Sequence, residues 1–144
     1  MIGIGCDHGG YELKEFIKKL LEERNIELKE FGIHDTNSVD YPDIAKPVCE
    51  SVISGESECG ILVCGTGIGM SIAANKIKGI RAAHVTDSYS ARMTKEHNNA
   101  NVICLGARIT GMEIAKDIVN AYLDAEFAGG RHQTRVDKIM ELEK

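Results

Sequence analysis

One stretch near the middle of the chain, residues 61–71, limits the folds open to this sequence more than any other. It begins with the apolar run Ile61-Leu62-Val63 and continues as Cys64-Gly-Thr-Gly-Ile-Gly-Met-Ser71. An apolar run without polar alternation is typical of a parallel strand covered on both faces. The glycines at positions 65, 67 and 69 permit positive φ angles and the close approach of a ligand. The stretch therefore predicts a buried strand that ends in a glycine-rich turn.

A short helix is expected after this turn, over residues 72–79. Lys76 and Lys78 would lie in its last turn, and Gly79 would end it. The free amide groups and the positive end of the helix dipole would face the turn, where they favour an anion. Met70 and Ser71 do not fit the common phosphate motifs, because a dinucleotide fingerprint requires glycine at 70 and a P-loop requires glycine and lysine at 70 and 71.

Cys64 occupies the junction between the expected strand and the turn. A buried cysteine is most often a small hydrophobic residue. A cysteine beside a helix N-terminus has a stabilised thiolate and is more reactive. The position of Cys64 favours the reactive thiol over the small hydrophobic residue.

The composition favours a small diffusible ligand over a macromolecular one. The 144 residues are 43% hydrophobic and 27% charged, as expected of one globular domain. A net charge of -5 and an aromatic content of 5% disfavour nucleic acid, which requires basic patches and stacking platforms. No apolar run approaches the roughly 18 residues of a membrane span and no signal peptide is recognisable, so we expect a cytoplasmic protein without membrane contact. Five cysteines without a C-x-x-C pair are expected to be reduced thiols.

Strand and helix patterns alternate five times along the chain. Apolar runs predict strands at residues 1–6, 26–31, 61–63, 80–85 and 102–105. Helical periodicity and capping residues predict helices at residues 13–24, 42–53, 72–79, 87–95 and 110–123. Within these helices Pro47 predicts a kink or a late start, and Thr110 with Glu113 predicts a capping box.

This alternation predicts a three-layer, doubly wound α/β fold with a sheet of five parallel strands in the order 2-1-3-4-5. Ligands of such folds bind at the carboxyl ends of strands 1 and 3. Asp7-His8 and Cys64-Gly65 follow these two strands and are expected to line one crevice.

The whole chain, residues 1–144, is expected to form one domain. Residues 1–128 would form the α/β core, and residues 129–144 follow the last sheet helix as a tail. The apolar stripe of the tail is too thin to hold a helix by itself. We therefore expect the tail to dock on a partner subunit.

Five motifs together resemble the ribose 5-phosphate isomerase type B family, which includes galactose 6-phosphate isomerase subunits and allose 6-phosphate isomerases. The resemblance runs almost the full length. It rests on Asp7-His-Gly-Gly10, the turn at 64–71 with Ala73-Ala-Asn-Lys76, His97-Asn98, Leu105-Gly-Ala-Arg108, and Arg131 with Arg135. One subgroup of the family carries glutamate where Met70 stands and lacks a cysteine at position 64, so this chain looks like the cysteine form.

The resemblance implies an aldose-ketose isomerase that acts on a phosphorylated pentose through a cis-enediolate, with no metal or organic cofactor. It assigns the catalytic roles to Cys64 as base and to His97, helped by Thr66, as proton donor to the ring oxygen. It implies a homodimer, or a dimer of dimers, with active sites at the subunit interface. The residues that it assigns to substrate binding are Asp7, His8, Gly65, Gly67, Ile68, Gly69, Ser71, Asn98, Arg108, Arg131 and Arg135.

Without the resemblance, several of these residues have ordinary explanations. Asp7 could equally cap the first helix, and His97 could be a solvent-facing residue at the end of a helix. Arginines are most often solvated surface residues. His34, His84 and His132 show no metal-ligand spacing, and Cys6, Cys49, Cys59 and Cys104 are most simply core residues.

Two alternatives to a pentose phosphate isomerase remain open. The substrate could be a 6-phosphate hexose such as allose or galactose 6-phosphate, because the loop at 34–41 that could bound the pocket has no readable shape. The chain could also be a noncatalytic phosphosugar-binding protein on the same fold.

Overall fold

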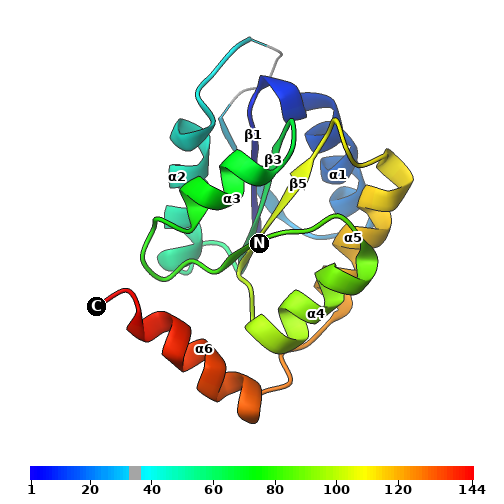
Figure 1. The fold of residues 1–144 in the computed structure, drawn as a ribbon. Helices are drawn as coiled ribbons and strands as arrows, with labels where there is room; N and C mark the ends of the chain where they lie inside the picture. The colour runs from blue at the N-terminus through cyan, green and yellow to red at the C-terminus, as the bar shows by residue number, and fades with distance from the viewer. Residues whose placement is uncertain (33–36) are drawn as a thin grey trace.

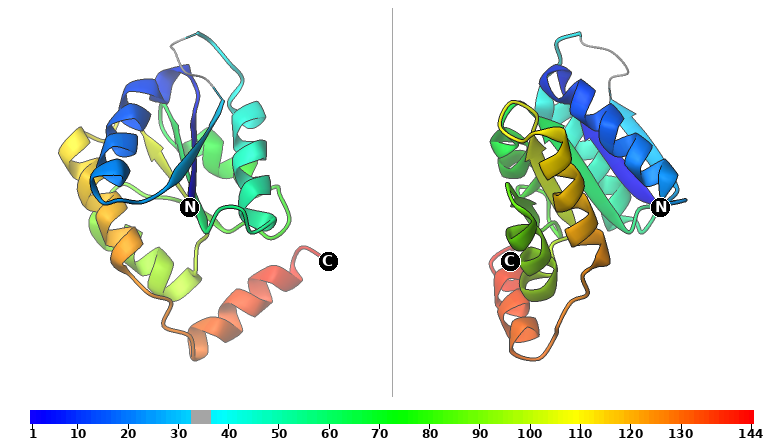
Figure 2. Two further views of the ribbon diagram at one scale, coloured as in Figure 1. Left: turned by 180° about the vertical axis from the view of Figure 1, so that it is seen from behind. Right: turned by 90° about the vertical axis from the view of Figure 1, so that its right-hand side faces the viewer.

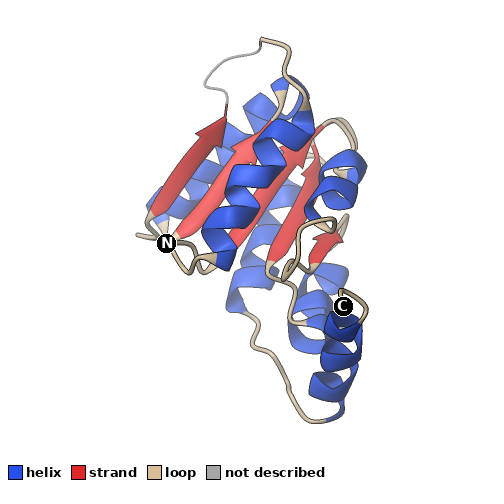
Figure 3. Ribbon diagram, turned by 90° about the vertical axis from the view of Figure 1, so that its left-hand side faces the viewer, coloured by secondary structure: helices blue, strands red, loops and turns tan. Residues whose placement is uncertain are grey.

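The centre of the molecule is a parallel sheet of five strands, in a computed structural model that describes residues 1–32 and 37–144 (Figure 1). The strands are β1 (Ile2–Cys6), β2 (Leu28–Gly32), β3 (Cys59–Cys64), β4 (Ala82–His84) and β5 (Val102–Gly106). The helices are the 3-10 turn η1 (His8–Gly10), α1 (Tyr11–Glu23), α2 (Tyr41–Ile53), α3 (Ile68–Ala74), α4 (Ser88–Asn98), α5 (Met112–Asp124) and α6 (Arg131–Glu141). Helices cover both faces of the sheet, so the expected α/β class is confirmed (Figures 2 and 3).

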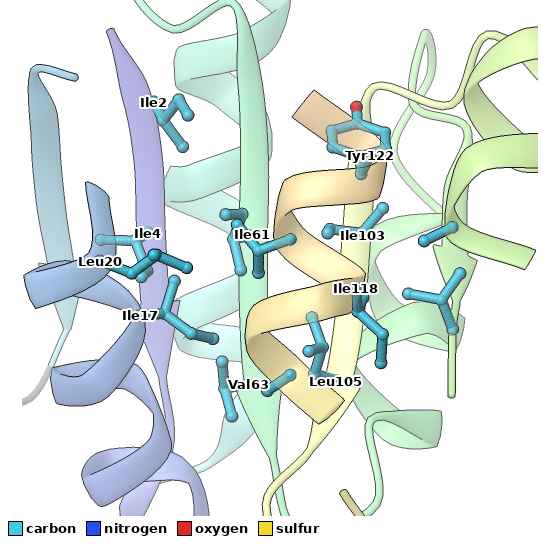
Figure 4. Packing of buried hydrophobic residues seen from close by; sticks show 14 of the residues in the cluster. Ile2, Ile4, Ile17, Leu20, Ile61, Val63, Ile103, Leu105, Ile118 and Tyr122 are labelled. Atoms are coloured by element: carbon cyan, nitrogen blue, oxygen red, sulfur yellow. The ribbon is translucent and has the colours of Figure 1, made fainter. Parts of the chain in front are cut away.

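Two hydrophobic clusters join the sheet to the helices on its two faces. On one face, α1 and α5 pack against Ile4, Ile61 and Ile103 (Figure 4). On the other face, α2 and α3 pack against Leu62 and Cys104. Every residue of β1, β3 and β5 is buried, which explains why these strands carry apolar residues without alternation.

The observed strand order is β2-β1-β3-β5-β4, so the expected order 2-1-3-4-5 is wrong in its last two positions. β5 pairs with both β3 and β4 and is buried along its whole length. β4 has only three residues, all half-buried, and lies at the edge. A longer apolar strand loses more water-exposed surface in the interior of the sheet than a short one does, and this difference favours β5 there.

The helix α3 lies nearer to the glycine-rich turn than the sequence indicated. It begins at Ile68 and ends at Ala74, so Lys76 and Lys78 follow the helix and the expected range 72–79 is wrong. The chain leaves the helix at Asn75, whose side chain exchanges hydrogen bonds of 2.8 and 2.9 Å with the backbone of Ala82.

Three further predictions concern the continuity of α2 and the N-terminal caps of α5 and α4. α2 runs through Pro47 without interruption from Tyr41, so the expected late start is wrong. The predicted capping box at α5 is also wrong, because Gly111 is the N-cap and the Thr110 amide donates to the Gly106 carbonyl instead, at 2.9 Å. The predicted cap of α4 is confirmed, since the Asp87 carboxylate accepts a 2.7 Å hydrogen bond from the Ser90 amide.

α6 forms an arm at one end of the molecule, drawn red in Figure 1, and packs against α4. The Gly79 amide donates to both carboxylate oxygens of Glu143, at 2.9 and 3.1 Å, and joins the end of the arm to the chain after α3. Ile139 and Leu142 remain exposed on it. Docking of this tail on a partner subunit stays a prediction. No helix among the described residues combines the length and apolar character that a membrane crossing requires.

A buried lysine fastens α1 to the edge strand β2. The Lys14 side chain is almost fully buried, and its ammonium group lies 2.6 Å from the Glu15 carboxylate and 2.8 Å from that of Glu30. Lys18 also contacts Glu30, at 3.2 Å. Burial alone would raise the pKa of Glu30, but the hydrogen bonds from the two lysines outweigh it and hold the pKa below its usual range.

Glu30→Gln should therefore lower the free energy of unfolding by about 2 to 3 kcal/mol at pH 7, because one buried ion loses its charged partner while Glu15 remains. The folded-state pKa of Glu30 is depressed, so its contribution is present above the unfolded-state pKa and is lost as pH falls through the folded-state value. Urea denaturation should show the deficit of the variant at pH 7 and little deficit at pH 3. The exposed Glu23 offers a control, Glu23→Gln, with little change at either pH; an equal deficit of Glu30→Gln at both values would contradict the prediction.

Candidate active site

The carboxyl ends of β1 and β3 lie side by side, as the sequence predicted. Cys6 is paired with Val63, and the Asp7 amide donates to the Val63 carbonyl at 3.2 Å. One oxygen of the Asp7 carboxylate accepts hydrogen bonds from the Gly9 and Gly10 amides, at 2.9 and 3.1 Å. Asp7 thus caps η1, the turn before α1, and this role holds the first loop of the site in place.

Cys64 is the last residue of β3 and is only 5% exposed. Its sulfur accepts a hydrogen bond from the Gly67 amide, at 3.1 Å. Gly67 has a φ of 83°, a conformation that strains residues with a side chain, and it is the N-cap of α3. The turn therefore places a backbone donor on the sulfur at the carboxyl end of β3.

The residues after Cys64 hold one another through side-chain to backbone hydrogen bonds. The Thr66 hydroxyl accepts from the Ile68 amide at 3.2 Å, and the Ser71 hydroxyl donates to the Ile68 carbonyl at 2.7 Å. The hydroxyl proton of Thr66 is not used in its bond to Ile68, so it can be donated to a ligand oxygen.

Arg108 adds a positive charge beside the turn, and His8 adds a hydrogen-bond donor. The Arg108 amide donates to the Gly65 carbonyl at 2.9 Å, and a Cβ built on Gly65 would lie 3.2 Å from the Arg108 guanidinium. His8 is exposed, and its Nδ1 accepts from the Val39 amide at 3.3 Å, which leaves the proton of the neutral ring on Nε2. A cavity of about 370 Å³ lies here, lined among others by His8, Arg108 and Met112. This arrangement can bind an anion.

Tyr41 also reaches the turn, although the sequence analysis assigned it no role. A Cβ built on Gly69 would lie 2.7 Å from the Tyr41 ring, so the ring lies directly over this glycine. Tyr41 begins α2, and a contact between α2 and α3 has no signal in the spacing of the sequence. The loop at 34–41 that was considered as a pocket boundary lies partly outside the described residues, as does His34.

Four of the predicted site residues lie at the opposite end of the sheet, where the strands begin. α4 runs from the end of β4 back toward the start of β5, so His97 and Asn98 in its last turn lie far from the carboxyl ends of the strands. Arg131 and Arg135 belong to α6, which packs beside α4. Figure 1 shows η1 at the top of the molecule and α6 at the bottom. One chain therefore brings Asp7, His8, residues 64–71 and Arg108 together but does not bring these four residues to them.

Three of the distant residues, His97, Arg131 and Arg135, form a basic group of their own with His132. The rings of His97 and His132 stack at 4.2 Å between centroids with an interplanar angle of 7°. Desolvation, together with the positive charges of His97, Arg131 and Arg135, lowers the pKa of His132. From the sequence, His132 was weighed only as a metal ligand, because its contact with His97 joins two helices that are far apart in the chain.

Within residues 1–32 and 37–144, no three histidine, cysteine, aspartate or glutamate side chains come together as a metal site would require. The basic, donor-rich turn around Cys64 instead suits a small anionic ligand.

Comparison with known proteins relates the chain to sugar phosphate isomerases. The Ribose/Galactose Isomerase family model matches residues 2–139. Ribose-5-phosphate isomerase B of Escherichia coli is 47% identical over 143 residues, covering 99% of this chain and 96% of the relative. D-erythrulose-4-phosphate isomerase of Pectobacterium atrosepticum is 45% identical over 140 residues, covering 96% and 91%. The structure of Clostridium thermocellum ribose-5-phosphate isomerase B is similar with a TM-score of 0.97 at 58% identity, covering 99% of this chain and 96% of that one.

Proposed function

The chain belongs to the Ribose/Galactose Isomerase family, and we propose that it interconverts ribose 5-phosphate and ribulose 5-phosphate through a cis-enediolate, with Cys64 as the base. The observation that carries the proposal is the hydrogen bond from the Gly67 amide to the Cys64 sulfur at the carboxyl end of β3. A thiolate in this position takes the proton from C2 of the open-chain aldose and returns it to C1, while the hydroxyl proton on O2 passes to O1. The electron pair of the broken C–H bond passes into the enediolate, so no electrons leave the substrate.

The developing negative charge on the substrate oxygen requires donors that are already in place. The turn after Cys64 offers the Thr66 hydroxyl and the N-terminus of α3, where the Gly67 and Ile68 amides already donate to the Cys64 sulfur and the Thr66 hydroxyl. Preorganised donors of this kind are worth about 2.7 to 4 kcal/mol each in other enzymes. His8 and Arg108 border the adjacent cavity of about 370 Å³, and we assign them to the phosphate and sugar oxygens.

Ring opening requires a proton donor, which we assign to His97 of a second copy of the chain. Cys64 lies at the carboxyl end of the strands. The opposite end of the sheet carries His97, Asn98, Arg131 and Arg135, so these residues cannot complete the site of their own chain. A homodimer in which each copy presents α4 and α6 to the Cys64 turn of the other makes two complete sites. A dimer of dimers would contain the same pairs.

The exposed apolar residues support this assembly. Ile68 and Ile72 lie on α3 beside the turn, Ile139 lies on α6 and Leu142 directly follows α6; all four are exposed. Burial of these side chains in a dimer would remove apolar surface from water at both ends of the contact.

All five cysteines are free thiols, and we place the enzyme in the cytoplasm.

The substrate is tested by comparing kcat/KM on four phosphates, those of ribose, erythrulose, allose and galactose. Ribose 5-phosphate should give the highest value, and each added carbon should cost about tenfold to two-hundredfold, as one methylene does in other pockets. A higher kcat/KM on either hexose 6-phosphate would replace the pentose with a hexose. Binding without exchange of the substrate C2 proton in D2O, followed by NMR, would identify a noncatalytic binding protein instead.

A further inference from the structure

His84 lies against the catalytic turn although it belongs to a different strand. It is the last residue of β4 and is paired with Cys104, on the face of the sheet that α3 covers. A Cβ built on Gly67 would lie 2.7 Å from Cδ2 and 3.1 Å from Nε2 of His84, and 2.9 Å from the carbonyl carbon of Leu105. The Gly67 backbone is thus held between the imidazole ring and the end of β5.

The ring makes this contact by its shape and not by hydrogen bonding through its buried nitrogen. The Nε2 atom of His84 is buried and, among the side chains of residues 1–32 and 37–144, it stands alone as a buried nitrogen or oxygen without a hydrogen-bond partner. Burying a polar atom without a partner lowers stability. An apolar side chain of similar size would therefore serve the same contact at a lower cost in stability.

Gly67 transmits the position of the ring to the base. Its amide donates to the Cys64 sulfur at 3.1 Å, and its carbonyl accepts from the Ser71 amide at 3.1 Å in the first turn of α3. A shift of Gly67 would move both the donor on the sulfur and the start of α3. A glycine has no side chain to anchor it, so its neighbours must fix its position.

We propose that His84 is a positioning residue, whose ring holds the Gly67 amide on the Cys64 sulfur by contact alone. The proposal rests on the role assigned to Cys64 above. It concerns the geometry of the donor and assigns His84 no proton transfer.

The test compares His84→Ala, which removes the ring, with His84→Leu, which keeps a side chain of similar reach without the nitrogen. His84→Ala should lower kcat on ribose 5-phosphate by about tenfold to a hundredfold, with KM nearly unchanged, because small misplacements of catalytic groups have effects of this size. Amide hydrogen exchange of Gly67, measured by NMR on the dimer, should be faster in this variant. His84→Leu should keep the kcat and the Gly67 protection of the wild type and should melt at a higher temperature.

Val52→Ala is the matched control, because Val52 packs from α2 against the hydrophobic cluster on the same face of the sheet. It should lose stability without loss of kcat. Wild-type kcat and Gly67 exchange in His84→Ala would overturn the proposal, and so would an equal loss in His84→Leu and His84→Ala. The exchange measurement does not depend on turnover, so a Cys64→Ala variant that kept its activity would remove the proposed base and leave the result on Gly67 interpretable.

Discussion

Replacement of Cys64 by alanine should leave the fold intact and lower kcat on ribose 5-phosphate by about 10²-fold to 10⁴-fold, the range that a positioned acid or base supplies. Alanine fits the space at the end of β3, so the melting temperature should change little. Without the sulfur, the Gly67 amide remains in place but no group in the turn can take the C2 proton. Steady-state kinetics and circular dichroism on the same preparations would separate the loss of chemistry from a loss of fold.

Cys59→Ala is a suitable control for this variant, because Cys59 is a buried cysteine at the opposite end of the same strand. It should show wild-type kcat. Exchange of the substrate C2 proton in D2O should stop in Cys64→Ala and continue in Cys59→Ala. Turnover near the wild-type level in Cys64→Ala would exclude Cys64 as the base.

A dimer that combines a Cys64→Ala subunit with a His97→Ala subunit should recover about half of the wild-type kcat, because two-fold symmetry places both substitutions in one site and leaves the other site intact. Each variant alone should be nearly inactive. In the mixed dimer, one site combines the intact Cys64 of one chain with the intact His97 of the other, and the second site lacks both. The two variants can be coexpressed with different affinity tags and the mixed dimer purified through both.

A second mixed dimer provides the control. A mixed dimer of a wild-type subunit and a subunit that carries both substitutions should be nearly inactive, because each of its two sites then lacks either Cys64 or His97. Sites formed within one chain would instead leave about half of the activity. More directly, a dimer of two subunits that each carry Cys64→Ala should stay inactive whatever the tags. Activity of the Cys64→Ala and His97→Ala mixture that does not exceed that of its parents would contradict a shared site.

The sequence predicted that Asp7 and Cys64 lie close together, because the carboxyl ends of adjacent parallel strands lie at the same end of the sheet. It did not predict that β5 separates β3 from β4, since strand order depends on how much surface each strand buries against its neighbours. It placed the start of α3 at residue 72, whereas the positive φ of Gly67 allows the helix to begin at Ile68. The contacts of Tyr41, His84 and His132 each join two elements that are far apart in the chain, so no local pattern could show them.

The order of the residues was enough to predict the α/β class, the strand and turn around Cys64 and the residue types that the chemistry needs. These depend on local periodicity and backbone freedom, which the order of the residues contains. Packing of the elements places Arg108 beside the Cys64 turn and places His97 and Arg135 at the opposite end of the sheet. Distances across a sheet follow from strand order and helix length together, and a linear chain fixes neither until its apolar surfaces pack.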